Sequence, residues 1–313
     1  MESMRLFIII VGLSLKFSLH AVAQVEKLTV REISQGNYVH LGHFPPASSD
    51  NHADVANIGF IVGEKCVLVI DAGNTIDIGE RLREAVASIT DRPICAIAVT
   101  HVHPDHLLGI NAFTDLPGLE IYGHHRLPKQ IKRRSSYYLE NLRDTFELES
   151  TRRYRIETDN FTLVDGTVEL DLGNRIVQLS SWGPAHTDHD LTVWDTRTRT
   201  FWSGDLVFSE HVPILDSNIR DFAEVLDELF EMDPDHYVVG HGSLDLPWKS
   251  LVAKQRHYLS VLMDETRYAL RHNQSLIDAV NQVGWSERDK WINFDKYHRR
   301  NVTTSFTDLE WED

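Results

Sequence analysis

The chain has 313 residues, of which 42% are hydrophobic and 25% are charged, and its formal net charge is −16. This composition is typical of a folded protein with one large domain or two ordinary ones, and it excludes disordered and fibrous classes. Proteins that bind duplex nucleic acid usually present a basic face, so the acidic balance argues against a nucleic-acid partner.

The first 23 residues have the features of an export signal. Arg5 precedes an apolar run at residues 6–15, and "AVAQ" provides a small-residue cleavage site that ends at Ala23. The apolar run is shorter than the roughly 20 residues that span a bilayer, so we expect cleavage and no stable membrane span. The sequence therefore predicts a periplasmic or secreted protein that begins at Gln24.

Strands and two helices are expected in the first half of the chain. "IGFIV" and "CVLVI" flank "GEK" as in a hairpin, and "PICAIAVTH" and "LEIYGHH" predict further strands. A charged helix is expected at residues 127–148. "AGNTIDIGERLREAVASI" has helical spacing, which places four apolar residues on one face, namely Ile78, Leu82, Ala85 and Ile89.

The two cysteines, Cys66 and Cys95, each begin an apolar strand-like segment. An exported protein can pair them, but buried free thiols are equally compatible with the sequence. Their spacing matches neither a metal site nor a catalytic dyad. The sequence leaves their pairing open.

Hairpin patterns return after residue 160. "FTLVDGTVEL" predicts a turn at Asp165-Gly166, "VELDLGNRIVQL" predicts one at Gly173-Asn174, and "LTVWDTRTRTFW" predicts one at residues 196–199. A helix is expected at residues 219–232, then the strand "HYVVG", and then only helices.

These elements predict an α/β protein in which two sheets pack face to face with helices outside. We expect this domain to span residues 24–245 and a helical extension, residues 246–313, to pack on it. The apolar residues of the extension are spaced to bury one stripe, namely Leu251, Tyr258, Leu259, Leu262, Ala269 and Leu270.

Potential metal ligands follow four of the predicted strands. "AVTHVHPDHLLG", residues 98–109, contains four of them, and "RIVQLSSW", "RTFWSG" and "HYVVG" each lead to one more. A lone H-x-H is weak evidence, and the alternative is a polar surface turn. Strand ends at one edge of a sandwich are neighbours in space, so we expect one common site. The seven candidates are His101, His103, Asp105, His106, His186, Asp205 and His241.

Spacing divides these candidates between two ions. Residues two apart in an extended chain point the same way, so His101 and His103 can bind one ion together. A helix that begins at Pro104 would turn the next ligands toward a second ion. The expected sets are His101, His103 and His186 for the first ion and Asp105, His106 and His241 for the second. Asp205 is expected to bridge both ions. An open coordination position is typical of a catalytic site, because structural zinc sites are closed.

These motifs resemble those of the metallo-β-lactamase superfamily. "THVHPDH", "AHT", "SGDLVF" and "VGHG" are similar to its successive metal motifs, and "VLVIDAG" is similar to one of its strand ends. The resemblance implies an αββα sandwich over about residues 36–242. It also implies that Asp71 orients a metal ligand. We expect Asp190, in "AHTDHD", to support the ligands as well, and His189 to face outward.

A narrower resemblance is to the quinoprotein relay system zinc metallohydrolases. It rests on the signal peptide, "HPDHLLG", "AHTDHDLTVWD", "GDLVF" and the terminal "YHRRNVTTSFTDLEWED". It implies an exported hydrolase that is linked to a quinoprotein dehydrogenase as its partner. Asp205 also resembles the aspartate of glyoxalase II and other thioester hydrolases, whereas one subclass of true metallo-β-lactamases has cysteine there.

We therefore expect a dinuclear hydrolase with Asp105 and Asp205 as catalytic carboxylates. Its substrate would be a thioester, a lactone or a similar small carbonyl compound, attacked by a hydroxide that bridges the two ions. Five histidines and two carboxylates suit two zinc ions per chain, and iron or manganese tolerate the same set. The alternatives are a mononuclear iron oxidoreductase of the persulfide dioxygenase type, a non-enzymatic periplasmic accessory protein of a quinoprotein system and, less expected, a true β-lactamase.

Two further segments are candidates for the mouth of the site. The basic segment "LPKQIKRR", residues 127–134, either attracts an anionic substrate or, as we favour, forms a solvated helix face. The C-terminal residues Tyr297, Arg299 and Arg300 could reach the site, as the corresponding region does in glyoxalase II.

Overall fold

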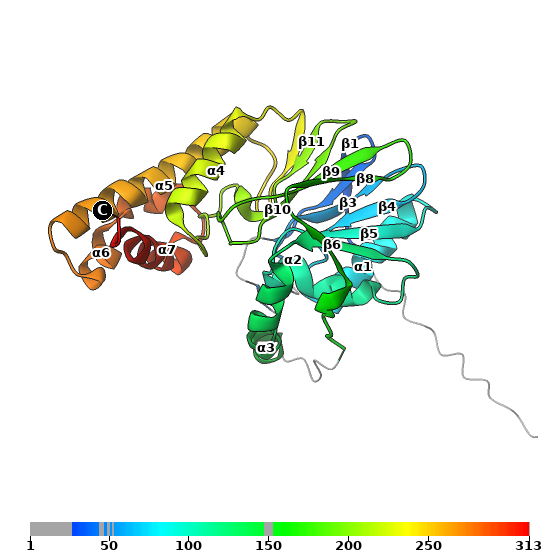
Figure 1. The fold of residues 1–313 in the computed structure, drawn as a ribbon, viewed down its shortest axis with the longest axis horizontal. Helices are drawn as coiled ribbons and strands as arrows, with labels where there is room; N and C mark the ends of the chain where they lie inside the picture. The colour runs from blue at the N-terminus through cyan, green and yellow to red at the C-terminus, as the bar shows by residue number, and fades with distance from the viewer. Residues whose placement is uncertain (1–26, 44–46, 49–50, 52, 147–152, 313) are drawn as a thin grey trace, which may run out of the picture.

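A computed structural model describes residues 27–43, 47–48, 51, 53–146 and 153–312 of the chain. Two sheets pack against each other and helices cover both outer faces, which confirms the expected α/β class and the αββα layering (Figure 1). The expected export signal lies outside the described residues. In the described part, no helix is both long and apolar enough to cross a bilayer.

The larger sheet has seven strands in chain order. The first four strands pair antiparallel, and β4 to β7 pair parallel. The strands are β1 (Arg31–Ser34), β2 (Asn37–His40), β3 (Ile58–Val62), β4 (Val67–Ile70), β5 (Ile94–Val99), β6 (Glu120–His124) and β7 (Phe161–Val164). The predicted hairpin around "GEK" is the β3–β4 pair.

The smaller sheet has five strands in the order β12-β11-β10-β9-β8. β11 and β12 pair parallel, and the other neighbours pair antiparallel. The strands are β8 (Thr167–Asp171), β9 (Ile176–Ser181), β10 (Leu191–Asp195), β11 (Thr200–Trp202) and β12 (His236–Val238). The turns predicted near residues 173–174 and 196–199 connect β8 to β9 and β10 to β11.

One expected hairpin is wrong. The turn at Asp165-Gly166 connects β7 to β8, but β7 lies at the edge of the larger sheet and β8 at the edge of the smaller one. The chain crosses from one sheet to the other at this turn. Local turn chemistry predicts the reversal of the chain, whereas tertiary packing decides which strand becomes the partner.

Side chains that alternate along each strand pack into the cores on the two faces of each sheet. In β4, Leu68 and Ile70 point into the core between the sheets, whereas Val67 and Val69 point into the core under the outer helices. β11 repeats this on the other sheet, where Trp202 faces the inter-sheet core and Phe201 faces the helices. Successive residues of a strand point to opposite faces, so both sheets are buried on both sides.

The helices fall into two groups (Figure 1). One group packs on the larger sheet and the other, which includes the C-terminal helices, shares a core with the smaller sheet. The helices are α1 (Ile76–Ile89), α2 (Pro104–Leu107), α3 (Leu127–Phe146), α4 (Ile219–Glu231), α5 (Trp248–Arg271), α6 (Leu276–Gln282) and α7 (Phe294–Leu309). In Figure 1, α5 to α7 gather beside α4 at one end of the molecule.

The predicted apolar stripes of α1 and α5 are largely buried. Thr75 caps α1 by accepting a hydrogen bond from the Ile78 N–H. Leu82 and Ala85 are buried as expected, but Ile89, the last residue of α1, is 42% exposed. In α5 the predicted stripe is buried except for Leu270, which is half-buried.

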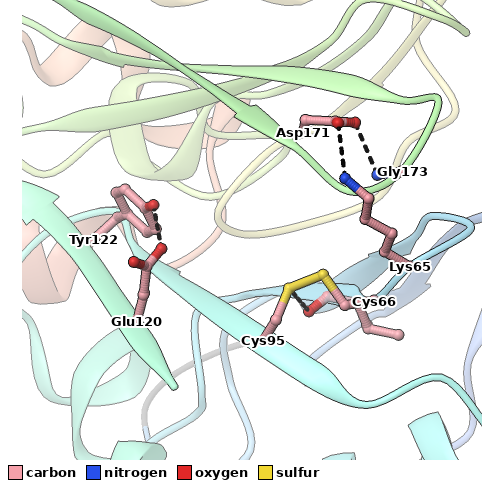
Figure 2. Close-up of a disulfide and its surroundings, with 8 residues drawn as sticks. Lys65, Cys66, Cys95, Glu120, Tyr122, Asp171 and Gly173 are labelled. Carbon is pink, nitrogen blue, oxygen red and sulfur yellow. Dashed lines mark hydrogen bonds and ion pairs between the residues drawn. A yellow bond between two sulfur atoms is a disulfide. The ribbon is translucent and has the colours of Figure 1, made fainter. Parts of the chain in front are cut away.

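The two cysteines form a disulfide, which the sequence had left open (Figure 2). Cys66 directly precedes β4 and Cys95 lies in β5, so the bond joins the beginnings of two parallel neighbours. The ligand-bearing loops follow the opposite ends of these strands. The disulfide therefore stabilises the larger sheet away from the candidate site.

Loss of this disulfide should destabilise the protein by about 3.6 kcal/mol, because the bond closes a loop with a sequence separation of 29 residues. Denaturant midpoints of the oxidised and reduced protein would measure the difference. A Cys66→Ala/Cys95→Ala variant should unfold like the reduced protein and should not respond to reductant. An unchanged midpoint after reduction would contradict the prediction.

Candidate metal centre

The seven candidate ligands meet at one edge of the sandwich. His101 follows β5, His186 lies in the loop after β9, and His241 follows β12. Asp205 lies in the 3₁₀ helix η3 (Gly204–Leu206), directly after β11. His103 precedes α2, which begins at the expected Pro104 and carries Asp105 and His106.

The first group comprises His101, His103 and His186. The Nδ1 atom of His103 lies 3.0 Å from His101 Nε2 and 3.0 Å from His186 Nε2. Ligand atoms of a tetrahedral zinc site are about 3.3 Å apart when Zn–N distances are about 2.0–2.1 Å. These spacings are close to that value, so the group can hold a metal ion.

The second group comprises Asp105, His106 and His241. The Oδ2 atom of Asp105 lies 3.3 Å from His241 Nε2 and 3.8 Å from His106 Nε2. These three ligand atoms are also spaced for a cation. The short helix α2 places Asp105 and His106 toward this second group, while His103 remains in the first.

Asp205 lies between the two groups. Its Oδ2 atom is 3.4 Å from His186 Nε2 in the first group and 3.3 Å from His241 Nε2 in the second. Its Oδ1 atom lies 3.2 Å from His106 Nε2, and neither of these buried atoms has a satisfactory hydrogen-bond partner among the described residues. Buried polar atoms normally have hydrogen-bond partners. A carboxylate oxygen and an imidazole nitrogen that have none are therefore suited to bind a cation.

The other ring nitrogen of each candidate histidine is hydrogen-bonded to the protein. The pairs are His101 Nδ1 with Thr100 Oγ1 at 3.0 Å, His103 Nε2 with Asp216 Oδ2 at 2.8 Å, His106 Nδ1 with Asp71 Oδ2 at 2.7 Å, His186 Nδ1 with the Ile214 carbonyl at 2.7 Å, and His241 Nδ1 with the Val55 carbonyl at 2.8 Å. Such partners fix the orientation and the tautomer of a metal-binding imidazole. The remaining nitrogen of each ring therefore lies toward the other candidate ligands.

Asp71 holds the ligand loop in place. It follows β4 with a positive φ of 55°, and its carboxylate accepts hydrogen bonds from the Thr100 N–H and the Thr100 hydroxyl, both at 2.8 Å. The same carboxylate binds His106, and Thr100 binds His101. One buried aspartate thus connects both candidate ligand groups.

Asp190 acts at a greater distance than expected. Its carboxylate accepts hydrogen bonds from the N–H and the hydroxyl of Thr187, at 2.8 and 2.6 Å, and it has no hydrogen bond to any of the seven candidates in the described structure. It therefore shapes the loop that carries His186. Burial raises the pKa of Asp190 to about 8.

The expected outward orientation of His189 is wrong. Its side chain is fully buried, with Nδ1 hydrogen-bonded to Asp188 and Nε2 accepting from the Val102 N–H at 3.2 Å. His189 thus fastens its loop to the segment that carries His101 and His103. Spacing along the loop gave no indication of this long-range contact.

Burial and charge make the centre receptive to cations. Burial lowers the pKa of His103 to about 4 and that of His186 to about 3, so both are neutral at pH 7 and have a free electron pair. Burial alone would also lower the pKa of His106, but Asp205, Asp71 and Asp105 raise it well above its usual value. A cation would replace the proton that these carboxylates favour.

Asp216 is a site residue that the sequence did not reveal. It lies in the loop before α4, its side chain is 3% exposed, and its carboxylate accepts the hydrogen bond from His103. Arg134 and Arg300 contact the same carboxylate. No spacing rule identifies a single aspartate in "PILDSN", because only the fold brings it to His103.

Replacing Asp216 with asparagine should weaken the first metal by about 10–100-fold, the usual cost of losing a partner of a metal-bound histidine. The change keeps the shape but removes the charge that orients and polarises His103. Competition with a chelator, measured separately for the two ions, would detect it. Equal affinity of wild type and variant for both ions would contradict this role.

A cavity of about 600 Å³ opens onto the centre. Asp105, His103, Asp205 and His241 contribute to its wall. α3 and α7 contribute further charged and hydrogen-bonding side chains, among them Arg134, Tyr138, Lys296, Tyr297 and Arg300. Of the three C-terminal candidates, Tyr297 and Arg300 thus reach the cavity, whereas Arg299 does not line it and binds Asn281.

The residues of the basic segment at the start of α3 have different surroundings. Lys132 and Arg133 are exposed, as expected for a solvated helix face. Arg134 instead lines the cavity.

Sequence reasoning also missed His211, which is buried beside Tyr297 and also lines the cavity.

Fold and site together define a member of a known family. A family model described as the metallo-beta-lactamase superfamily matches residues 53–241, more than half of the chain. The chain belongs to the metallo-β-lactamase superfamily. This confirms the broad resemblance, whereas the comparisons do not show the narrower one to the quinoprotein relay proteins.

Two curated relatives have measurable sequence similarity. The "Beta-lactamase-like protein 2 homolog" of Caenorhabditis elegans is 25% identical over 251 residues, which cover 78% of this chain and 74% of that protein. The "Linear primary-alkylsulfatase" of Pseudomonas sp. (strain ATCC 19151) is 38% identical over 47 residues, only 15% of this chain and 9% of that protein.

Several solved structures have a fold similar to that of this chain. A β-lactamase domain protein from Burkholderia ambifaria has a TM-score of 0.65 at 14% identity and covers 90% of this chain and 87% of its own. The sec-alkylsulfatase Pisa1 from Pseudomonas sp. has a TM-score of 0.69 at 12% identity and covers 91% and 50%. A metallo-β-lactamase from Pontibacter korlensis has a TM-score of 0.58 at 18% identity, covering 75% of this chain and 99% of its own.

Proposed function

We propose that the protein is a dinuclear metal-dependent hydrolase, with zinc as the best-suited metal and a thioester, a lactone or a similar carbonyl compound as substrate. The observation that carries the proposal is the position of Asp205, whose carboxylate lies within 3.4 Å of ligand nitrogens in both groups. A site for one ion needs no carboxylate that reaches two sets of ligands. Two adjacent groups support a centre for two ions.

Bound divalent cations would supply Lewis acidity, which polarises the substrate carbonyl and lowers the pKa of a coordinated water. The chain supplies geometry and charge. The five histidines hold their ligand nitrogens in one orientation, and Asp205 fixes the separation of the two groups. Asp105, with a side chain that is 17% exposed and lines the cavity, is placed to accept a proton from the attacking water.

Several residues would bind the substrate. The cavity is large enough for a small molecule, and its wall combines aromatic groups such as Tyr138 and Tyr297 with cationic groups. His211 donates its Nδ1–H to the Val212 carbonyl, and its Nε2, which has no hydrogen-bond partner among the described residues, can accept one. No nucleophilic serine or cysteine is required, because the attacking group is water.

Export to an oxidising compartment is the second part of the proposal. Residues 1–23 have the pattern of a cleaved signal, and the Cys66–Cys95 disulfide supports this location, since disulfides persist mainly outside the reducing cytosol. N-terminal sequencing of exported protein should find Gln24 first, and an intact Met1 would contradict cleavage.

A link to a quinoprotein dehydrogenase rests on sequence resemblance alone, and a pull-down with such an enzyme would test it.

A panel of substrates tests the reaction. Metal-loaded protein should hydrolyse a thioester or a lactone with a higher kcat/KM than any β-lactam. Efficient turnover of carbapenems without thioester hydrolysis would contradict the proposed substrate class. Oxygen consumption with a persulfide, in protein that holds one iron, would instead indicate the dioxygenase type.

Sulfate-ester hydrolysis is a second candidate reaction. It is favoured by the local similarity to an alkylsulfatase and by the fold of a second one, which covers 91% of this chain. The same seven ligands would serve it. Including primary and secondary alkyl sulfates in the panel separates the two reactions, since sulfate release without thioester turnover would identify the second.

A further inference from the structure

Two arginines from distant parts of the chain meet beside the candidate metal centre. Arg134 lies in α3 and Arg300 in α7, and both line the cavity. Arg134 Nη1 lies 3.3 Å from Asp216 Oδ2, and Arg300 Nη2 contacts Asp216 Oδ1. Since Asp216 Oδ2 also accepts the hydrogen bond from His103, the arginine pair is one residue removed from a candidate ligand.

Asp216 uses only part of the hydrogen-bonding capacity of the pair. A guanidinium group has five N–H donors. The only further hydrogen bond of either guanidinium group to the described residues is from Arg134 to the Tyr138 hydroxyl, at 3.4 Å. The side chains of Arg134 and Arg300 are 34% and 55% exposed, respectively. Donors therefore remain available on two side chains that line the cavity.

The charges of the cavity favour an anion. Its charged wall consists of three cations, Arg134, Lys296 and Arg300, and three carboxylates, Asp105, Asp205 and Asp216. Two of the carboxylates belong to the candidate ligand groups, and Asp216 is already paired with both arginines. With divalent cations in the centre, the cavity would be positively charged although the whole chain is at −16. Such a local field concentrates anionic ligands.

The two guanidinium groups lie close together although their positive charges repel each other. Burial, and then the charge of Arg134, lower the pKa of Arg300 from its usual value. Asp216 supplies one negative charge for two positive ones, so the pair keeps an excess of one positive charge. A bound carboxylate would neutralise this excess, and planar, two-point hydrogen bonding suits a guanidinium group.

We propose that Arg134 and Arg300 together bind a carboxylate or a similar oxyanion group of the substrate, while the scissile bond lies at the metal centre. The protein then selects anionic substrates over neutral ones of the same shape. This inference rests on the proposed function in one respect, because it requires metal to bind the other end of the substrate. The rival view is that the arginines serve only to position Asp216.

Two matched ligands test the selectivity without any turnover. The monohydroxamate of succinate and its terminal amide have the same metal-binding group and nearly the same size, but only the first has a carboxylate. Calorimetric titration of the metal-loaded mature protein should show that the acid binds at least about tenfold more tightly, as expected for charge-assisted hydrogen bonds. A wild type that binds the two equally, or that binds neither, would overturn the inference.

Variants then assign the preference to the arginine pair. Arg134→Gln and Arg300→Gln should each reduce the preference for the acid to within about threefold, without changing metal content or the affinity for the amide. Arg133→Gln and Arg299→Gln are matched controls, because each removes a neighbouring arginine that does not line the cavity. If the amide loses affinity in parallel with the acid, or if the controls act like the test variants, the arginines do not form this subsite.

The outcome is separable from the proposed reaction. An arginine-dependent preference for the acid in a protein that hydrolyses nothing in the panel would contradict the proposed hydrolysis and leave the binding site in place. Conversely, hydrolysis of thioesters with equal affinity for acid and amide would contradict only the arginine subsite.

Discussion

Replacing Asp205 with asparagine should lower kcat for the preferred substrate by about 10²–10⁴-fold, the range typical of losing one positioned catalytic group. The side chain of Asp205 is 2% exposed, and its two oxygens lie among ligand nitrogens of both groups. Burial would raise its pKa, but His241, His106 and His101 hold that pKa well below its usual value, so the group is charged at neutral pH. Asparagine keeps the shape and removes this charge.

The loss of charge should also weaken the metals, because the carboxylate offsets their mutual repulsion. Steady-state kinetics with saturating metal separates this effect from the catalytic one, since added metal should restore occupancy but not the full kcat. A variant that retains wild-type kcat would show that Asp205 does not bridge the ions.

The double variant His101→Ala/His103→Ala should hold close to one metal ion per chain, and its hydrolytic activity should be lost. The first group would keep only His186 and the shared Asp205, too few protein ligands for a stable catalytic site. The second group does not use these histidines and should stay occupied. Metal analysis after removal of free ions measures the difference.

The matched control removes two imidazoles outside the centre. His125 and His236 are exposed and belong to neither ligand group. His125→Ala/His236→Ala should therefore keep two ions and full activity. A fully loaded His101→Ala/His103→Ala protein would contradict the assignment of the first group.

The parts of the site that could be predicted from the sequence are those set by local geometry. His101 and His103 lie two positions apart in the segment directly after β5, and Pro104 starts the short helix that turns Asp105 and His106 toward the second group. The ends of the predicted apolar strands also indicate where the loops that carry the other candidate ligands begin. The seven candidates meet because all these strands end at the same edge of the sandwich.

The parts that could not be predicted depend on contacts between distant segments. Asp216 reaches His103 across 113 residues, and His189 reaches Val102 across 87. Arg134 belongs to a basic segment that looks solvated, yet the packing of α3 turns this one residue into the cavity. Local patterns carry no information on such pairs, since each residue is unremarkable within its own segment.

The same distinction applies to the fold. The Asp165-Gly166 turn is encoded locally, but β7 and β8 join different sheets because of the packing of the whole domain. The C-terminal helices were expected from their apolar stripes, and their shared core with the smaller sheet follows from the fold. This shared core brings α7, and with it Arg300, to the cavity.

The central claim is that the centre holds two metal ions, and elemental analysis of protein purified without added metal or chelator tests it most directly. We predict close to two divalent ions per chain, predominantly zinc, with one ion retained by the His101→Ala/His103→Ala variant. A stoichiometry of one, or the absence of metal from active protein, would contradict the dinuclear centre.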